Sequence, residues 1–430
     1  MERYNEYKDS SVQWLGEIPS HWECEKAKRH FQSRKQIVGR NSSQYERLAL
    51  TLKGVIKRFE GDGVGLNPEK LDTYQIVDKD DLIFKLIDLE NVSTSRVGLS
   101  PYKGIVSPAY IRISAVDEVN IRFAEYYYLN MWMRHIFNDL GTPGVRSNLS
   151  STDLLNLPLL YPSIVEQQAI ATYLDKATAK IDEAIAQQQK MIDLLNERKQ
   201  IIINNAVTKG LNPDAPMKDS GVDYIGLIPE HWVVRRMASL GVFSKGGGIS
   251  RDNLLEEGEP AILYGDIYTK YNYFAEDIKN HVSKKVALAS VEVHKNELLM
   301  TGSGETKEDI GKTIVFLGNK AYAGGDVIIF KQDNNNSSFL SYALNSSYAK
   351  NFRYKESKGE IVVHIYANAV RQLYLALPDI TEQNSIVEYL NNKVGIIDSE
   401  ICVVRKQISL LQERKQIIIN DVVTGKVKVS

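Results

Sequence analysis

The residues best suited to chemistry lie in the stretch GSGETKEDIGKT, which runs from Gly302 to Thr313. Its last three residues, Gly311-Lys312-Thr313, match the end of a phosphate-binding loop, whose backbone N–H groups and lysine hold the phosphates of a nucleotide. That loop needs another glycine at position 306, where this chain has Thr306. The sequence therefore favours a glycine-rich hairpin loop over an ATP site.

The other candidates for catalysis are isolated residues. Cys24 and Cys402 form no metal-type or redox-type pair, and the seven histidines are not spaced as metal ligands. The stretch SKGGG lacks the three spaced glycines of a dinucleotide-binding turn. His21 and His231 each precede a tryptophan, and this recurrence favours a packing and hydrogen-bonding pair over catalysis. We therefore expect binding rather than catalysis, with no metal and no cofactor held by this chain.

Two segments carry a local excess of positive charge. Five basic and two acidic residues lie between Arg40 and Glu60, and the same numbers lie between Lys350 and Arg371. Arginine and lysine close to tyrosine, asparagine and glycine suit phosphate contacts and the reading of base edges. A net charge of −1 argues against a basic coat over the whole molecule but leaves room for such patches. The alternative is an ordinary solvated surface.

Length and composition set the class of protein. A chain of 430 residues is expected to form two or more domains, and 43% hydrophobic with 25% charged residues is typical of a soluble globular protein. The chain lacks both a run of about 18 apolar residues and the apolar core of a signal peptide. We therefore expect a cytoplasmic protein that makes no contact with a membrane.

The chain contains one unit twice. The stretch KDSSVQWLGEIPSHW, from Lys8 to Trp22, shares nine of its fifteen positions with KDSGVDYIGLIPEHW, from Lys218 to Trp232. Near the other end of each unit, LLNERKQIIIN from Leu194 corresponds to LLQERKQIIIN further along. A period of roughly two hundred residues is too long for a solenoid, so it indicates duplicated domains related by a pseudo-twofold axis.

The first part of each unit is expected to be an α/β domain of about 150 residues. Strands are predicted for QIVDKDDLIFKLI, GIVSPAYIRI, EPAILYGDIY, KTIVFLG and DVIIFK. Amphipathic helices are predicted for RFAEYYYLNMWMRHIF and SFLSYALNSSYAKNFRY.

The second part of each unit is expected to be one long helix. Apolar residues recur at alternating spacings of four and three, which indicates a coiled-coil seam: Leu390, Val394, Ile397, Ile401, Val404, Ile408 and Leu411, and in the first unit Leu174, Thr178, Ile181, Ile185, Gln188, Ile192 and Leu195. Thr178 and Gln188 are polar breaks that can fix the register. Each helix has capping-box spacing at its start, Ser163 with Glu166 and Asp379 with Glu382. Gly210 and Gly425 are the predicted stops.

Since a single helix with a bare apolar stripe is not stable in water, we expect the two long helices to pair with each other. The pseudo-twofold layout favours an antiparallel coiled coil. A helix from Ile164 to Ala206 would be ~65 Å long.

These repeated segments resemble the specificity subunits of Type I restriction–modification systems. The resemblance rests on IPSHW and IPEHW, on the helix starts PSIVEQQ and PDITEQN, and on the twin ERKQIIIN segments, and it covers the whole chain. It implies α/β (α+β) target-recognition domains over residues 1–161 and 211–377. These alternate with helical regions over residues 162–210 and 378–430, which form the coiled coil.

The resemblance also implies a function and its partners. Each globular domain would read one half of a split target in double-stranded DNA, with the helices as the spacer. The helices would also dock two methyltransferase subunits, which bring S-adenosylmethionine. Two restriction or translocase subunits, which bring ATP and Mg²⁺, would join for cleavage. This chain would perform no chemistry, while the assembly would methylate adenine at N6 and cut DNA in an ATP-dependent reaction.

For DNA contacts we nominate basic residues that lie beside glycine-rich or polar loops. They are Lys57, Arg58, Lys85, Arg96 and Arg146 in the first domain, and Lys245, Arg251, Lys307, Arg353, Lys355 and Lys358 in the second. Two alternatives stay open at this point. One is a stand-alone nuclease or methyltransferase, and the other is a protein–protein scaffold whose globular domains bind peptides.

Overall fold

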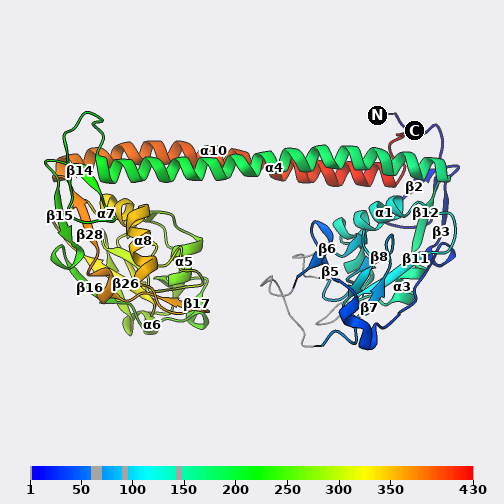
Figure 1. Cartoon of the computed structure of the whole chain (residues 1–430), viewed down its shortest axis with the longest axis horizontal. Helices are drawn as coiled ribbons and strands as arrows, with labels where there is room; N and C mark the ends of the chain where they lie inside the picture. Colours follow the sequence, from blue (N-terminus) through cyan, green and yellow to red (C-terminus); the bar gives the residue numbers. More distant parts are fainter. Residues whose placement is uncertain (1, 60–69, 90–94, 142–147, 430) are drawn as a thin grey trace. The chain divides into compact units, whose positions relative to one another are not determined.

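The computed structural model describes residues 2–59, 70–89, 95–141 and 148–429. The chain divides into two compact units: unit 1 combines Met1–Gln189 with Arg405–Ser430, and unit 2 is Lys190–Val404. Each unit contains a sheet-rich domain and a share of two long helices, α4 (Ile164–Lys209) and α10 (Ile380–Val423) (Figure 1). Among the described residues, no helix has the length and apolarity needed to cross a membrane.

In unit 1, two four-stranded sheets run in the orders β6-β5-β10-β7 and β4-β11-β8-β9, and two strand pairs join β1 to β2 and β12 to β3. β5 and β10 are parallel, whereas the other pairs are antiparallel. The strands are β1 (Tyr7–Asp9), β2 (Glu17–Pro19), β3 (Glu23–Lys26), β4 (Phe31–Gln32), β5 (Arg47–Thr51), β6 (Gly54–Arg58), β7 (Gln75–Val77), β8 (Leu82–Phe84), β9 (Val97–Leu99), β10 (Gly104–Val106), β11 (Ile111–Ala115) and β12 (Pro158–Tyr161).

The helices of unit 1 are α1 (Ile121–Met133), α2 (Ile136–Leu140) and α3 (Ser151–Asn156). Helix α1 buries Phe123 and Tyr127 in a core that also contains Leu174 of α4 and Val423 of α10. The single helix predicted over this segment is in fact two. His135, with φ of 58°, adopts a left-handed conformation that ends α1 and redirects the chain into α2.

In unit 2, two five-stranded sheets run in the orders β16-β26-β22-β24-β19 and β17-β20-β18-β25-β21, and three strand pairs join β13 to β14, β15 to β28 and β23 to β27. The strands are β13 (Met217–Asp219), β14 (Leu227–Pro229), β15 (Val233–Arg236), β16 (Val242–Lys245), β17 (Leu254–Leu255), β18 (Glu259–Ile262), β19 (Phe274–Ala275), β20 (Asn280–Val282), β21 (Val291–His294), β22 (Leu298–Thr301), β23 (Ser303–Gly304), β24 (Thr313–Phe316), β25 (Lys320–Ala323), β26 (Val327–Lys331), β27 (Val363–His364) and β28 (Tyr374–Leu377).

The short helices of unit 2 are α5 (Tyr264–Thr269), α6 (Lys284–Leu288), α7 (Ser337–Leu344), α8 (Ser347–Glu356) and α9 (Ala367–Val370). Helix α7 packs on the long helices as α1 does in unit 1, with Phe339 and Tyr342 in a core that includes Ile203 of α4 and Leu390 of α10. Two predictions need correction. The strand predicted for EPAILYGDIY stops at Ile262, where helix α5 follows. The helix predicted from Ser338 is two helices: α7 ends at its C-cap Asn345, whose side chain bonds to the backbone of Thr313.

The predicted seam of the long helices is confirmed. Leu174, Ile181, Leu390 and Ile397 are buried, and the polar break Thr178 is buried as well. Thr178 Oγ1 donates to the carbonyl of Leu174 at 2.7 Å and lies 3.1 Å from the hydroxyl of Tyr126 on α1. Thr178 therefore links the helix pair to the globular domain of unit 1 through its contact with Tyr126.

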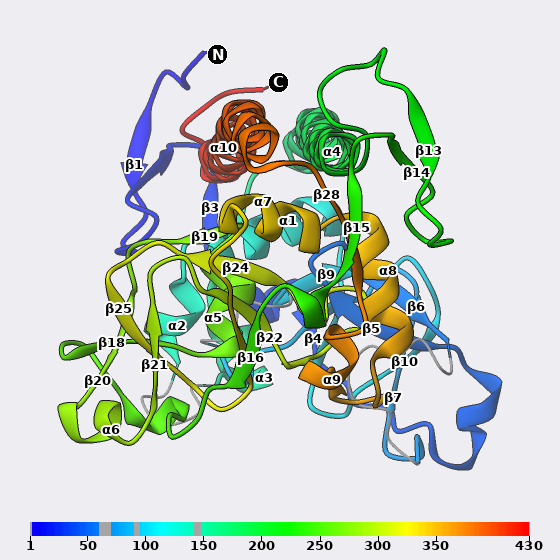
Figure 2. The same cartoon turned by 90° about the vertical axis from the view of Figure 1, so that its left-hand side faces the viewer.

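The antiparallel pairing is also confirmed within each unit. In unit 1, Asp182 of α4 forms an ion pair at 2.7 Å with Lys415, near the end of α10. In unit 2, Lys199 near the end of α4 pairs at 2.6 Å with Asp398 of α10. Figure 2 views the two helices along their axes and shows them side by side. Each ion pair corresponds to the other under the internal repeat.

Candidate nucleic-acid interface

The repeated His-Trp pair holds the start of a long helix in each unit. In unit 1, Trp22 Nε1 donates to Glu166 at 3.2 Å, and His21 Nε2 lies 3.1 Å from the same carboxylate. In unit 2, Trp232 Nε1 donates to Glu382 at 3.1 Å, and His231 Nε2 lies 2.8 Å away. Both tryptophans are fully buried. Each histidine, together with its tryptophan, therefore hydrogen-bonds to the glutamate at the start of a long helix, as expected.

The end of the other long helix completes each of these arrangements. Gly425, just after α10, lies against Trp22, and Gly210, just after α4, lies against Trp232. Both glycines have φ of 72°, the left-handed stop expected from the sequence. We call each set a glutamate clasp: His21, Trp22, Glu166 and Gly425 in unit 1, and His231, Trp232, Glu382 and Gly210 in unit 2.

The residue after each clasp glutamate fixes the globular domain to the helix. Gln167 accepts from the backbone N–H of Asn120 at 2.8 Å, and Gln383 accepts from that of Asn336 at 2.9 Å. These asparagines cap α1 and α7. The domain and the helix start are therefore joined by the same bonds in both units, so each recognition surface is held in a defined orientation on its helix.

A groove of about 1050 Å³ opens on the domain of unit 2. Two nominated residues line it: Lys245 at the end of β16, and Arg251 in a short turn of helix. Lys245 is exposed and lies 3.5 Å from Asp326, while Arg251 is exposed too. The groove therefore presents two exposed positive side chains of the kind that contact phosphates.

The hairpin between β22 and β24 forms one wall of this groove, through Glu305, Thr306 and Asp309. The nominated Lys307 belongs to the same loop and is half-buried. The structure confirms a hairpin loop here. Lys312 Nζ donates to the carbonyls of Tyr271 at 2.6 Å and Tyr268 at 3.2 Å.

The other nominated residues of unit 2 fall into two groups. Lys355 and Lys358 are exposed at the end of α8 and beyond it, outside the lining of the groove. Arg353 is buried, and its Nε donates to the carbonyl of Ile310 at 3.0 Å while Nη1 donates to that of Leu344. Burial excludes Arg353 from contact with DNA in this conformation, which corrects the nomination.

In unit 1, Lys57 and Arg58 lie on strand β6 and are half-buried. Lys57 pairs with Glu46 at 2.5 Å, and its ammonium lies 4.8 Å from the ring centre of Tyr102. Lys85 is half-buried after β8; burial lowers its pKa, and nearby Arg96 lowers it further.

The other two residues nominated for DNA contact in unit 1 are Arg96 and Arg146. Arg96 is fully buried, and its Nη2 donates to the carbonyl of Asp88. Arg96 therefore lies in the interior of the domain, and its nomination as a DNA contact is corrected as well. Arg146 lies outside the described residues.

The sequence reading missed the aromatic lining of the groove. Tyr264 and Tyr268 on α5 line it together with Lys270. Burial raises the pKa of Tyr268 to about 12, so its phenol keeps its proton at neutral pH. The run YGDIYTK holds aromatic and basic residues at helical spacing, which is the signal that could have identified them.

Comparison with known proteins agrees with this architecture. Residues 28–192 match the family model described as Type I restriction modification DNA specificity domain. The chain is 23% identical over 380 residues to the Type I restriction enzyme MjaVIII specificity subunit of Methanocaldococcus jannaschii, covering 86% of this chain and 84% of that one. It is 26% identical over 317 residues to the EcoBI specificity subunit of Escherichia coli, covering 68% and 62%.

A solved structure shares the fold. It comes from a study of complex assembly and conformational transition of the type I R-M system, and it matches with a TM-score of 0.66 at 13% identity. The match covers 95% of this chain and 99% of that chain. The chain is therefore similar over most of its length to the specificity subunits of Type I restriction–modification systems.

Proposed function

We propose that this chain is the non-catalytic DNA-recognition subunit of a Type I restriction–modification complex in the cytoplasm. Each globular domain reads one half of a bipartite target in double-stranded DNA. The observation that carries this proposal is the glutamate clasp, which joins two differently built domains to equivalent helix starts. One attachment for two different surfaces is what a subunit needs when its two half-sites differ in sequence.

We assign the functional regions by where the helices start. Residues 1–161 and 211–377 are the target-recognition domains, and residues 162–210 and 378–430 are the helical regions. The end of β12 at Tyr161 and the start of α4 at Ile164 support the first boundary. The end of β28 at Leu377 and the start of α10 at Ile380 support the third.

We assign DNA contact to those nominated residues that are exposed or half-buried. In unit 2 they include Lys245 and Arg251 in the groove, with Lys307 on its wall and Lys355 and Lys358 near the end of α8. In unit 1 they include Lys57, Arg58 and Lys85. Lysine and arginine of this kind neutralise backbone phosphates, and each such contact makes affinity more dependent on salt.

Exposed apolar residues on the long helices support the docking of two methyltransferase subunits. Leu194 and Ile201 of α4 lie in unit 2, and their counterparts Leu410 and Ile417 of α10 lie in unit 1; all four are about half exposed. Apolar side chains exposed in a row are typical of protein interfaces. The methyltransferase subunits bring S-adenosylmethionine, and two restriction subunits bring ATP and Mg²⁺.

The experiment that tests the proposal changes the length of the helices. Seven residues with the same heptad pattern are inserted after Lys190 in α4 and after Lys406 in α10, which are corresponding positions in the two copies. Each insertion adds ~10 Å of helix, or about three base pairs of DNA. The variant is produced with its partner subunits, and methylated adenines are mapped across the genome.

We expect the same two half-sites separated by a longer gap. As a control, seven residues are inserted after Pro213, in the exposed connection that follows α4, and this should leave the gap unchanged. An unaltered gap in the helix variant would show that the helices do not set the spacing. Methylation by the chain without its partners would instead support a stand-alone enzyme.

A further inference from the structure

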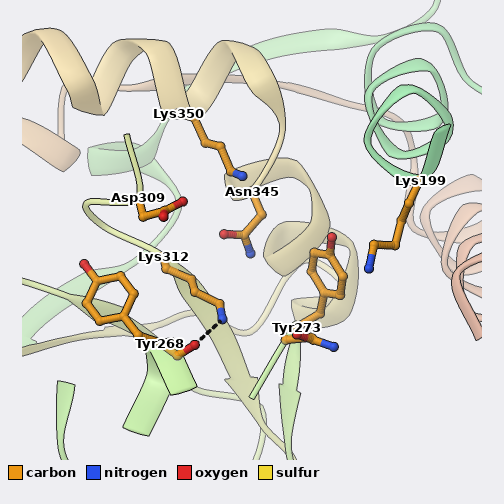
Figure 3. Close-up of a pocket in the computed structure, with 8 residues that line it drawn as sticks. Lys199, Tyr268, Tyr273, Asp309, Lys312, Asn345 and Lys350 are labelled. Atoms are coloured by element: carbon orange, nitrogen blue, oxygen red, sulfur yellow. Dashed lines mark hydrogen bonds between the residues drawn. The ribbon is translucent and has the colours of Figure 1, made fainter. Parts of the chain in front are cut away.

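A second hollow in unit 2 is rich in lysine and shares Tyr268 and Asp309 with the lining of the groove. It has a volume of about 230 Å³. Figure 3 shows Lys199 from α4, Lys312 from the end of the hairpin loop and Lys350 from α8 around it, with Asp309 beside them. Three elements far apart in the sequence therefore bring ammonium groups to one small space.

The walls of this pocket are tied together. Gln200 of α4 donates to the carbonyl of Asn345 at 3.2 Å, and Asn204 accepts from the backbone N–H of Ser347 at 2.8 Å. Asn345 Nδ2 donates to the carbonyl of Thr313 at 2.6 Å. These bonds connect α4, the turn between α7 and α8, and the start of β24, so the lysines project from a fixed frame.

The positive charge of the pocket exceeds its negative charge. Lys199 is paired with Asp398. Lys312 donates to two backbone carbonyls, which hold its ammonium without neutralising it. The side chain of Lys350 makes no hydrogen bond or ion pair with any residue in the described part of the chain, although its backbone N–H donates to the carbonyl of Ser346. Among the described residues that line the pocket, Asp309 is thus the only carboxylate, opposite Lys312 and Lys350.

The electrostatic cost of placing these lysines together is seen in their pKa values. Burial lowers the pKa of both Lys312 and Lys350; the charge of Asp309 partly offsets this, and the charge of Lys199 lowers each pKa further. An opposite charge close to these ammonium groups would favour their charged form. The groups around the pocket therefore select an anion.

We propose that this pocket binds a phosphate group, held by Lys350 and Lys312 with Lys199 at its edge. The group comes from inorganic phosphate or from the terminal phosphate of a nucleotide. A volume of about 230 Å³ lies below the ~300–1,000 Å³ of pockets that enclose a drug-sized ligand. The pocket accommodates one phosphate and its water, and a nucleoside would remain outside.

The test is a titration of the full chain with inorganic phosphate at constant ionic strength, adjusted with chloride. Binding is followed by calorimetry and by the rise in melting temperature. We expect saturable binding by the natural chain. Lys350→Met should weaken it at least tenfold, because it removes the ammonium that has no other partner. Lys284→Met, which removes an exposed lysine of α6 in the same unit, should leave binding unchanged.

A second variant and a second ligand make the result decisive. Lys350→Gln keeps a polar side chain, so equal loss in both variants assigns the effect to the charge rather than to misfolding. ATP in place of phosphate distinguishes the sources: tighter binding of ATP that also depends on Lys350 identifies a nucleotide as the ligand. Equal phosphate effects in the natural chain and in Lys350→Met, or no saturable effect at millimolar phosphate, would overturn the proposal.

Discussion

The two units attach their domains in the same way and build those domains differently. The clasp glutamates, the glutamines that follow them and the ion pairs of the long helices all correspond between the units. The sheets do not: unit 1 has two of four strands, whereas unit 2 has two of five in another order. The repeated part of the chain positions the domains, and the part that differs determines what each domain recognises.

The two glutamate clasps differ in the hydrogen bonds and the exposure of their glutamates. Glu166 also accepts a hydrogen bond from the hydroxyl of Tyr4 at 3.0 Å, in addition to those from His21 and Trp22. Its counterpart Glu382 is bonded to His231 and Trp232 and is more exposed, with 27% of the side chain accessible against 13% for Glu166. We therefore expect the clasp of unit 1 to be the firmer of the two.

The largest effect is expected from the clasp tryptophans. Trp22→Ala and Trp232→Ala each remove a fully buried indole, which costs about 3–5 kcal/mol of unfolding free energy. Hydrogen exchange resolved by peptide should show lost protection in the unit that carries the change. Loss of protection in both units from one substitution would contradict the division into separate units.

The stop glycines should respond unequally. An alanine at either position is strained because φ is 72°, which costs about 1–2 kcal/mol. At Gly425 the new Cβ would also collide with the ring of Pro19, whereas at Gly210 its nearest neighbour is Glu382 Oε1 at 3.0 Å. Gly425→Ala should therefore lower the melting temperature more than Gly210→Ala. The reverse order would show that the end of α10 adjusts more easily than expected.

The recognition surfaces can be compared through salt dependence. Lys245→Ala in unit 2 and Lys57→Ala in unit 1 should each weaken binding to target DNA and reduce the salt slope by about one. Lys57 lies closer to its carboxylate partner, at 2.5 Å from Glu46 against 3.5 Å between Lys245 and Asp326, and is less exposed, so its effect should be the smaller. Binding is measured by fluorescence anisotropy from low to high salt, with Lys284→Ala as the control. An unchanged slope removes that lysine from the DNA-contacting surface.

The smallest effect is expected from the helix ion pairs. Asp398→Asn and Asp182→Asn break corresponding bonds to Lys199 and Lys415, and partly exposed pairs contribute about 0–1 kcal/mol. Asp398 is the less exposed carboxylate, so Asp398→Asn should cost more by chemical denaturation. Equal costs would mean that exposure does not distinguish the two pairs.

The paired helices and their ends could be predicted because their signals are local. Seven-residue spacing, the capping residues and a glycine stop all lie within a few positions of the feature they determine. The partner of Trp22 could not be predicted, since Glu166 lies 144 residues away. The repeat indicated only that both His-Trp pairs have the same role in packing and hydrogen bonding, without naming their partner.

The domains were harder to predict for physical reasons. Charge was taken as a sign of exposure, but Arg353 is buried because carbonyls from distant elements, at Ile310 and Leu344, accept its hydrogen bonds. Arg96 similarly donates to the carbonyl of Asp88. In EPAILYGDIY, a short apolar run fits a strand and a helix equally well, so the tyrosines of the groove were placed on the wrong element.

The division of the chain has a consequence for the order of folding during synthesis. Unit 2 is one continuous segment, so it can close as soon as its last residue leaves the ribosome. Unit 1 cannot, because Ile419, Val422 and Val423 of α10 belong to its core. The domain that is translated first is therefore completed last, and until then Ile170 and Leu174 lack part of their apolar cover.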